Sequence, residues 1–548
     1  MLRDRTLVPT LILIAIGFGA LALLAMPAGA NAADAADSPP ETPETELVEA
    51  DLASVEAAFA AGTLTAEALS GAYLDRIDAL DVGGPALNTL LFVNPTALER
   101  ARELDEERAG KAGAGALYGV PVVVKDNINV AGLPTTGGSV ALRGHEPFTD
   151  ATVVARLRAA GAIMLGKSNL SEMQLPYGRF GYSSAGGQTR NPYNLRRAPF
   201  SCATAAAVAA NLAMLGVGSD TVGALRGSAA TTALVGIRPT LGLTSRAGVI
   251  PTALSLDVTG PLARTVRDAA LMLGVLAAVD EADPRTEDSA PHQDVDYTKA
   301  LDAEALEGAR IGVLRRFKGG NPEVDAAFRR AVETLAAGRA AMVDVDIPDD
   351  IADAWNAMLA TLVETEQRDQ LDAYLRNTEE GMPHSLADLL RMSESPLIAG
   401  SDRPVHPGRI GAYRNALQSP GLANLDYLYI VSNRMPAARA ALMSLMDAEK
   451  LDALVMPTLL CPASSLLDDY DESYECNVDD PDRPLQVASL TGFPEITLPM
   501  GFTEQGLPLG LSLLGRPYSE PRLIALAYAF EQTTGHRRPP EFVSTPAD

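Results

Sequence analysis

The chain has 548 residues, of which 47% are hydrophobic, so it is long enough to bury a sizeable core in one large domain or in several. Its 44 basic and 70 acidic residues leave a net charge of −26, which argues against a nucleic-acid partner because phosphate binding needs a basic surface. The five histidines show neither HxxxH nor HxH spacing, so no metal site is expected.

The N-terminal 46 residues predict an export signal and a linker. An apolar run over residues 7–26 is followed by the small residues Ala30 and Ala32, a pattern that fits signal-peptidase cleavage after Ala32. Residues 1–32 are therefore interpreted as a signal peptide, and the length of the run leaves an uncleaved membrane anchor open. The Pro- and acid-rich residues 33–46 indicate a disordered linker. We expect a periplasmic or secreted protein that meets a membrane only if the first segment is retained.

The body of the chain, residues 47–541, predicts an α/β architecture. Thr65 is placed to cap a helix with apolar side chains on one face. A β-rich run, a helical stretch and a second β-rich run follow one another at the spacing of a strand, a helix and a strand; they are residues 120–126, 152–161 and 162–169. Residues from about 280 to 450 have helical periodicity and predict a mostly helical insertion.

The three cysteines do not form a disulfide framework. Cys461 and Cys476 could pair in an oxidising compartment, while Cys202 is expected to be a small buried hydrophobe. Residues 161–168 match the nucleotide-binding pattern GxxxxGK[ST], but the four intervening residues are apolar and strand-forming, whereas a phosphate loop needs a flexible turn. We therefore reject nucleotide binding at this segment.

Lys125 is the first residue to suggest chemistry. It follows the apolar run 122–124, and a lysine at the mouth of a buried strand is desolvated, which favours its neutral, basic form. A neutral lysine can deprotonate a serine hydroxyl. The alternative for Lys125 is a surface ion pair with Asp126.

Several segments, in order along the chain, resemble the amidase signature family. They are GVPVVVKDNINVAGLPTTGGS, LGKSNLSE, GGQTRNPYN, AAAVAANLA, GSDTVG, VGIRPTLGLTSRAGVIP and DVTGPLARTVRDAA. The closing stretch is similar to the bacterial peptide-amidase branch in particular. The resemblance runs from about residue 45 to 541, and it implies a three-layer α/β/α fold around a central mixed β-sheet, without a cofactor.

The family implies a catalytic set made of a nucleophilic serine, a second serine with a cis peptide bond, and a lysine base. The lysine position matches Lys125. The oxyanion-hole amides fall on Thr221, Val222 and Gly223, where they would hold the negative charge of a tetrahedral intermediate. The nucleophile position is Ala224, because the family's GSDTGGS reads GSDTVGA in this chain.

A second departure lies upstream of Ala224. The family's Gly/Ser loop, of the kind GGSSGGS, is replaced by residues 200–204, which read FSCAT and are two residues shorter. Ser201 and Cys202 are the candidates for the cis-serine position. Arg226 is present as the family predicts, but Gly227 and Ser228 follow it in place of the usual apolar-Pro pair.

These departures leave two hypotheses about function. The favoured one is a pseudoenzyme or binding protein that keeps a cleft for a small amide or peptide ligand, because an alanine methyl cannot attack a carbonyl. The alternative is an active amidase with a rerouted nucleophile, which would be Ser228, Ser201, Cys202 or a water activated by Lys125. The sequence does not determine the oligomeric state of the protein.

Overall fold

The computed structural model describes residues 47–108, 115–175, 180–352, 355–466 and 474–542. The signal peptide and linker predicted for residues 1–46 lie outside the described residues. Within the described ranges, no helix is both long and apolar enough to cross a membrane.

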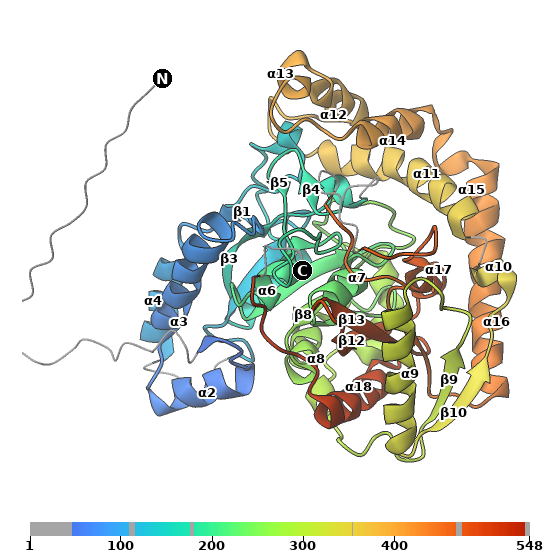
Figure 1. Cartoon of the computed structure of the whole chain (residues 1–548). Coiled ribbons are helices and arrows are strands. Elements are labelled where there is room, and N and C mark those ends of the chain that lie inside the picture. Colours follow the sequence, from blue (N-terminus) through green and yellow to red (C-terminus); the bar gives the residue numbers. More distant parts are fainter. Residues whose placement is uncertain (1–46, 109–114, 176–179, 353–354, 467–473, 543–548) are drawn as a thin grey trace, which may run out of the picture. The chain divides into compact units, whose positions relative to one another are not determined.

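A central sheet runs through the described part of the chain and organises the fold (Figure 1). Eleven strands of the described residues form it, in the order β1-β3-β2-β6-β8-β7-β12-β13-β11-β9-β10. Their bounds are β1 Leu90–Val93, β2 Pro121–Lys125, β3 Ile163–Ser168, β6 Leu215–Asp220, β7 Val235–Arg238, β8 Val258–Ala263, β9 Arg310–Leu314, β10 Ala341–Val345, β11 Ala453–Pro457, β12 Glu495–Phe502 and β13 Pro508–Leu514. Strand β2 is parallel to β3 and to β6, whereas β6 is antiparallel to β8, so the sheet is mixed as predicted.

Helices connect and cover these strands. Their bounds are α2 Leu52–Ala61, α3 Ala66–Arg76, α4 Ala97–Arg108, α5 Thr152–Ala159, α6 Ala203–Ala209, α7 Ala224–Thr231, α8 Val266–Leu276, α9 Pro322–Ala337, α10 Asp349–Ala352, α11 Trp355–Leu375, α12 Leu386–Ser393, α13 Pro396–Ala399, α14 Pro407–Gln418, α15 Leu425–Tyr429, α16 Met435–Ala448, α17 Gln486–Thr491 and α18 Glu520–Thr534. Thr65 caps α3 as expected, because its side chain accepts a hydrogen bond from the Ala68 N–H at 3.0 Å. The predicted strand–helix–strand order is confirmed by β2, α5 and β3.

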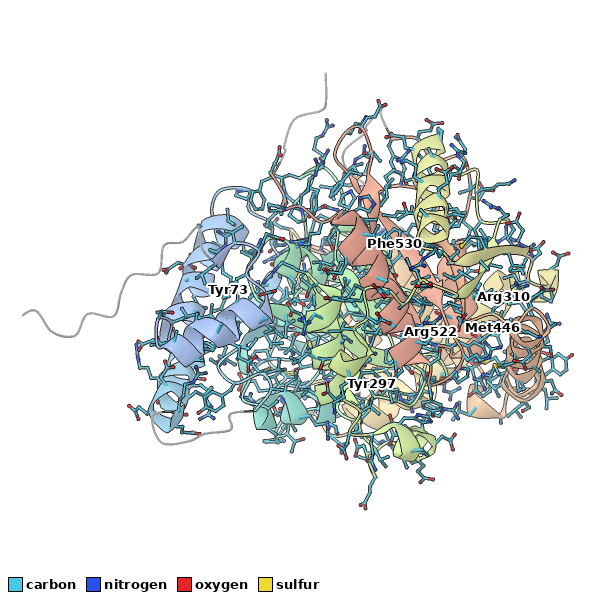
Figure 2. The ribbon with its side chains drawn as sticks, turned by 90° about the horizontal axis from the view of Figure 1, so that it is seen from below. Tyr73, Tyr297, Arg310, Met446, Arg522 and Phe530 are labelled. Atoms are coloured by element: carbon cyan, nitrogen blue, oxygen red, sulfur yellow. A yellow bond between two sulfur atoms is a disulfide. The ribbon has the colours of Figure 1, made fainter. Side chains whose placement is uncertain are left out.

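The sheet separates two hydrophobic clusters. Successive side chains of a strand point to opposite faces, and on β11 Val455 belongs to one cluster while Leu454 and Met456 belong to the other. The first cluster includes buried side chains of α9 and α18, such as Phe530, which Figure 2 shows on α18. The second includes buried side chains of α16 and α17. Helices therefore cover both faces of the sheet, which gives the three layers that the family resemblance predicts.

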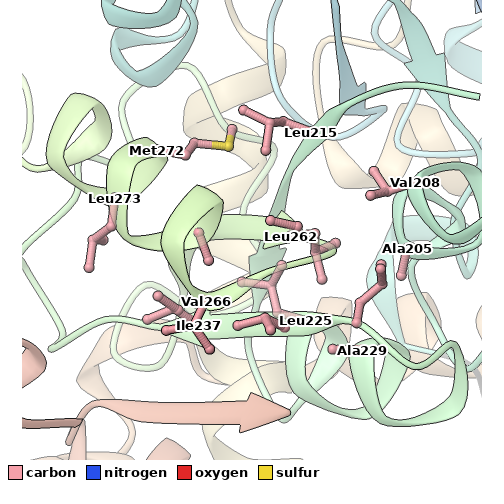
Figure 3. Packing of buried hydrophobic residues seen from close by; sticks show 14 of the residues in the cluster. Ala205, Val208, Leu215, Leu225, Ala229, Ile237, Leu262, Val266, Met272 and Leu273 are labelled. Carbon is pink, nitrogen blue, oxygen red and sulfur yellow. The ribbon is translucent and has the colours of Figure 1, made fainter. Parts of the chain in front are cut away.

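Helix α7 packs closely on the sheet. Figure 3 shows Leu225 and Ala229 of α7 beside Ile237 of β7 and Leu262 of β8. The approach depends on a missing side chain in β7, because a Cβ added to Gly236 would lie 2.8 Å from the Cβ of Ala229. This close contact places the last turn of α7 directly on β7.

The region from 280 to 450 is helical apart from two strands that the sequence analysis did not predict. Strands β9 and β10 pair in parallel at one edge of the sheet. Strand β10 is short and half-exposed and carries Asp344, so its pattern does not stand out from the surrounding helical sequence. Downstream of this region, Cys461 and Cys476 form a disulfide, and Cys202 is a free, buried thiol.

Candidate functional site

The candidate site lies where two neighbouring parallel strands end. Lys125 is the last residue of β2 and Asp220 is the last residue of β6, and Val124 pairs with Val217 between the two strands. The carboxyl ends of parallel strands meet at one edge of a sheet, which is where open α/β folds place their ligands. The structure thus brings Lys125 next to the segment 218–224, as the family resemblance implies.

Lys125 is fully buried and its ammonium group bonds Ser219. Its Nζ donates to Ser219 Oγ at 2.9 Å and to the Ser219 carbonyl oxygen at 3.2 Å. Burial lowers the pKa of Lys125 below its usual value, although its electrostatic interactions with Cys202, Asp220 and Asp257 oppose the shift. The expectation of a desolvated lysine is confirmed, whereas the surface ion pair with Asp126 is wrong. Asp126 pairs with Lys167 at 3.1 Å instead, and both of those side chains are buried too.

Ser219 has a full set of hydrogen bonds, which the sequence analysis did not anticipate. Its Oγ accepts from Lys125 and from Asn127 Nδ2 at 3.1 Å, and it donates to Gln174 Oε1 at 2.8 Å. The hydroxyl proton of Ser219 is therefore directed at Gln174 and away from Lys125. Ser219 could have been suspected from its position beside Asp220, but Gln174 lies 45 residues upstream and carries no local signal.

A buried charge network supports the turn after β6. Asp220 accepts from Arg226 at 3.0 Å and from Arg238 at 2.8 Å, and Arg226 also contacts Glu495 at 2.7 Å. Burial alone would raise the pKa of Asp220, but Arg226 and Arg238 outweigh it and hold that pKa well below its usual range. Every charge in this group faces an opposite charge, so the network holds the ends of β6, β7 and β12 in place around α7.

The turn of residues 221–223 leads from this network into α7. Gly223 caps the helix with φ of 110°, a left-handed conformation that favours glycine, and its N–H donates to Asp220 Oδ1 at 2.8 Å. Of the three predicted oxyanion amides, that of Gly223 is thus already hydrogen bonded. Thr221 is held through its hydroxyl, which donates to Asp257 Oδ1 at 2.6 Å. Burial raises the pKa of Asp257 to about 6, although Thr221 opposes this shift.

Ala224 is the first residue of α7 and is 8% exposed. A methyl group at this place offers neither a nucleophile nor a hydrogen-bond donor. The N-terminus of α7 nonetheless points toward the end of β6, where the Arg226 N–H donates to Asp220 Oδ2 at 3.4 Å.

The segment of residues 200–204, whose last two residues begin α6, is fitted to α7 by an aromatic side chain. Phe200 has a positive φ of 63°, and its ring stacks on that of Phe180 with centroids 4.4 Å apart. A Cβ added to Gly227 would lie only 2.6 Å from the Phe200 ring. The ring therefore occupies the space that Gly227 leaves, one turn of α7 after Ala224.

The other candidate nucleophiles of the sequence analysis bond to the backbone. Ser201 Oγ donates to the Gln174 carbonyl oxygen at 3.3 Å, and Ser228 Oγ accepts from the Cys202 N–H at 2.9 Å. The buried Cys202 thiol lies over β6, since a Cβ added to Gly218 would be 3.2 Å from its sulfur. Phe200 on Gly227 and Cys202 on Ser228 are thus contacts between this segment and α7.

No group of three or more His, Cys, Asp or Glu side chains that could hold a metal ion occurs among the residues that the structure describes. Residues 163–168, inside the rejected nucleotide-binding pattern, form the fully buried strand β3.

Comparisons with known proteins agree on the ancestry of this site. A family model described as Amidase matches residues 68–524. A probable amidase of Arabidopsis thaliana is 32% identical over 511 residues, covering 90% of this chain and 92% of the relative. A glutamyl-tRNA(Gln) amidotransferase subunit of a Synechococcus strain is 36% identical over 492 residues, covering 87% of this chain and 91% of the relative. The structure of peptide amidase from Stenotrophomonas maltophilia is similar with a TM-score of 0.81 and 37% identity, covering 90% of this chain and 99% of that one.

Proposed function

Because the chain belongs to the amidase signature family, we propose that it keeps a site for a small amide or peptide ligand but lacks the serine hydrolysis of that family. The observation that carries this proposal is Ala224, which starts α7 where the family resemblance expects the nucleophilic serine. Loss of the nucleophile costs on the order of 10⁶-fold in rate in a serine-protease reference case. We extend the proposal to an exported protein that acts in the periplasm or outside the cell.

The binding part of the proposal rests on the turn before α7. The amides of Thr221 and Val222 would donate to the carbonyl oxygen of the ligand, because they precede the helix N-terminus and the Asp257 carboxylate holds the Thr221 side chain. The similarity to a peptide amidase supports a peptide with a C-terminal amide as the ligand. The buried network of Asp220 and Arg226 supports this role because it keeps the turn rigid without help from residue 224.

The loss of chemistry is supported by the fit of the loop to α7. A serine placed at position 224 alone would leave the segment 200–204 unchanged. In that segment Phe200 fills the space at Gly227, and the Cys202 N–H donates to Ser228 Oγ. The segment 200–204 therefore packs on α7 in an arrangement of its own, which differs from that of a Gly/Ser loop.

A second candidate function is an amidase with a different nucleophile, and the Lys125–Ser219 contact favours it. Lys125 Nζ lies 2.9 Å from Ser219 Oγ, and burial lowers the pKa of this lysine, so the two side chains have the separation of a serine–lysine pair. Against this candidate, Ser219 as a whole is only 2% exposed and its hydroxyl proton is directed at Gln174. Ser201, Ser228 and Cys202 remain part of the same alternative.

A serine-reactive fluorophosphonate probe and a binding titration separate the two functions. We expect the purified protein to bind a C-terminally amidated dipeptide saturably, more tightly than the free acid, and to carry no probe adduct by mass spectrometry. An adduct on Ser219, Ser201 or Ser228 would establish the second function, as would a measured amidase activity lost on alkylation of Cys202. Absence of any amide binding would refute the binding proposal.

Restoration of the expected residues tests the same point from the other side. The Ala224→Ser variant alone is expected to regain little hydrolysis, because residues 200–204 still carry the refitted loop. Ala224→Ser combined with a GGSSGGS-type loop in place of residues 200–204 is the stronger test. Strong hydrolysis from the single substitution would show that the present loop supports catalysis.

A further inference from the structure

A separate pocket of about 330 Å³ lies between helix α2, the end of α4, the turn before β2 and helix α8. Its apolar walls come from Leu52, Val55, Phe59, Tyr118, Val120 and Leu271. Arg108 and Glu56 are the charged residues in its lining. Ligand sites of small molecules have this size and this mixture of apolar walls with few polar groups.

Arg108 is the unusual member of the lining. Its guanidinium group lies over the Phe59 ring at 4.0 Å and over the Tyr118 ring at 5.1 Å. One N–H donates to the Tyr118 carbonyl oxygen at 3.1 Å, while the buried Nε has no hydrogen-bond partner among the described residues. Within the described ranges no carboxylate forms an ion pair with Arg108, in contrast to Arg102 on the same helix, which pairs with Glu67 at 2.7 Å.

The position of the aromatic rings decides which donors of Arg108 are left for a ligand. Ring contacts use the faces of the guanidinium group, whereas its N–H groups point outward in its plane. Contacts with the two rings use none of the N–H donors of Arg108, so the donors at the edge of its guanidinium group that do not bond the Tyr118 carbonyl oxygen are left for an oxygen acceptor, and a carboxylate matches that edge.

We propose that this pocket binds a small amphipathic carboxylate, with the carboxylate on the edge of Arg108 and an apolar chain along Leu52, Val55 and Leu271. The apolar walls disfavour a purely ionic ligand such as inorganic phosphate, because these side chains cannot replace the hydrogen bonds that the anion makes with water. Glu56 opposes the anion and sets a limit on its affinity.

The pocket is distinct from the amide site. Val120 precedes the first residue of β2, whereas Lys125 is its last residue. At roughly 3.3 Å per residue, the strand puts the two places about 16 Å apart, at opposite ends of β2. The proposal for this pocket is therefore independent of the proposal for Ala224.

Calorimetric titration with octanoate tests the pocket, with 1-octanol as the neutral ligand of equal chain length. We expect saturable binding of octanoate at one site, at least tenfold tighter than that of 1-octanol. The Arg108→Gln variant should lose at least tenfold in octanoate affinity and change little toward 1-octanol. The matched control Arg102→Gln removes the same charge from the same helix outside the pocket and should leave octanoate affinity unchanged.

The comparison of the two ligands needs no variant, so the proposal stays testable if Arg108→Gln fails to fold. Glu56→Gln should tighten octanoate binding two- to threefold, because it removes the opposing carboxylate. Absence of saturable octanoate binding, equal binding of the neutral alcohol, or equal losses in the Arg108 and Arg102 variants would each overturn the proposal.

Discussion

The two sides of the turn at Ala224 are built on different physical principles. On one side, Asp220, Arg226, Arg238 and Glu495 form a buried network in which each charge faces an opposite charge. On the other side, the contacts of the segment 200–204 with α7 include the Phe200 ring on Gly227 and the hydrogen bond from the Cys202 N–H to Ser228 Oγ. The network matches the family resemblance at Arg226, whereas the loop departs from it.

This difference teaches which parts of a site can change without loss of the fold. A member of a buried charge network cannot be replaced alone, because the partner that stays behind is a desolvated charge. A loop contact made of van der Waals packing can be replaced by another of similar volume. Relative to the family resemblance, this chain departs at contacts of the second kind and keeps those of the first, so the framework around the turn does not depend on the segment 200–204.

The largest effect is expected from Arg226→Met, which leaves the buried Glu495 carboxylate without its cation and removes one partner of Asp220. The free energy of unfolding should fall by about 3–5 kcal/mol, as for other buried pairs that lose one member. Thermal and urea denaturation measure the change. Arg102→Met is the control, because its surface pair with Glu67 should contribute no more than about 1 kcal/mol. Similar losses in both variants would show that the network stabilises no more than a surface pair.

A pH-dependent effect of intermediate size is expected from Glu172, which lies beside the loop in the short helix Glu172–Gln174. Burial raises the pKa of Glu172 to about 7, although the Ser184 N–H and Arg409 oppose the shift. Between pH 4.5 and 7 the folded protein then holds a proton that the unfolded chain has lost. Stability from this group therefore falls as pH rises through that window, by about 3 kcal/mol at most.

Denaturation of Glu172→Gln at several pH values measures this contribution as a difference from the unchanged protein. The difference in unfolding free energy should vary between pH 4.5 and 7 and be flat on either side. Other buried acids contribute with the same sign, so only the difference is informative. Glu304→Gln is the control at an exposed position, and its curve should run parallel to that of the unchanged protein. A parallel curve for Glu172→Gln would contradict the raised pKa.

The framework side was largely predictable from the sequence, and the loop side was not. The apolar run before Lys125 predicts a buried strand end, and the structure places Lys125 there. Strand, helix and strand also follow in the predicted order. These features are local, since period and composition within a short window determine them.

The fit of Phe200 to Gly227 could not be predicted, because it joins residues 27 positions apart through the tertiary fold. The sequence showed only that both positions depart from the family pattern. Likewise, Gln174 accepts the hydrogen bond of Ser219 while its own backbone has a positive φ of 81°. No pattern of residue types in the sequence indicates that conformation. Contacts of this kind depend on where two distant segments meet in the fold, and the secondary-structure propensities of residues do not determine that meeting point.

A smaller loss, about 1–3 kcal/mol, is expected from Gly227→Ala. In an open helix this substitution stabilises by up to about 1 kcal/mol, but here the new Cβ would lie 2.6 Å from the Phe200 ring. Gly71→Ala in α3 is the matched control, since its nearest neighbour would be Leu98 at 4.0 Å, and it should stabilise. In the Phe200→Ala background, Gly227→Ala should lose its penalty. An equal penalty with and without the ring would show that Phe200 does not fill that space.

The smallest effect, about 1 kcal/mol, is expected from Ser228→Ala. The substitution removes the acceptor of the Cys202 N–H and leaves that donor buried, a loss only partly offset by the higher helix propensity of alanine. Ser70→Ala is the matched control, because Ser70 is equally buried in a helix while its Oγ has no hydrogen-bond partner among the described residues. That variant should be neutral or stabilising, since it removes an unpaired hydroxyl. If both variants behaved alike in urea denaturation, the Ser228 hydroxyl would not hold the loop. Phe200 would then be the contact that fits the shortened loop to α7.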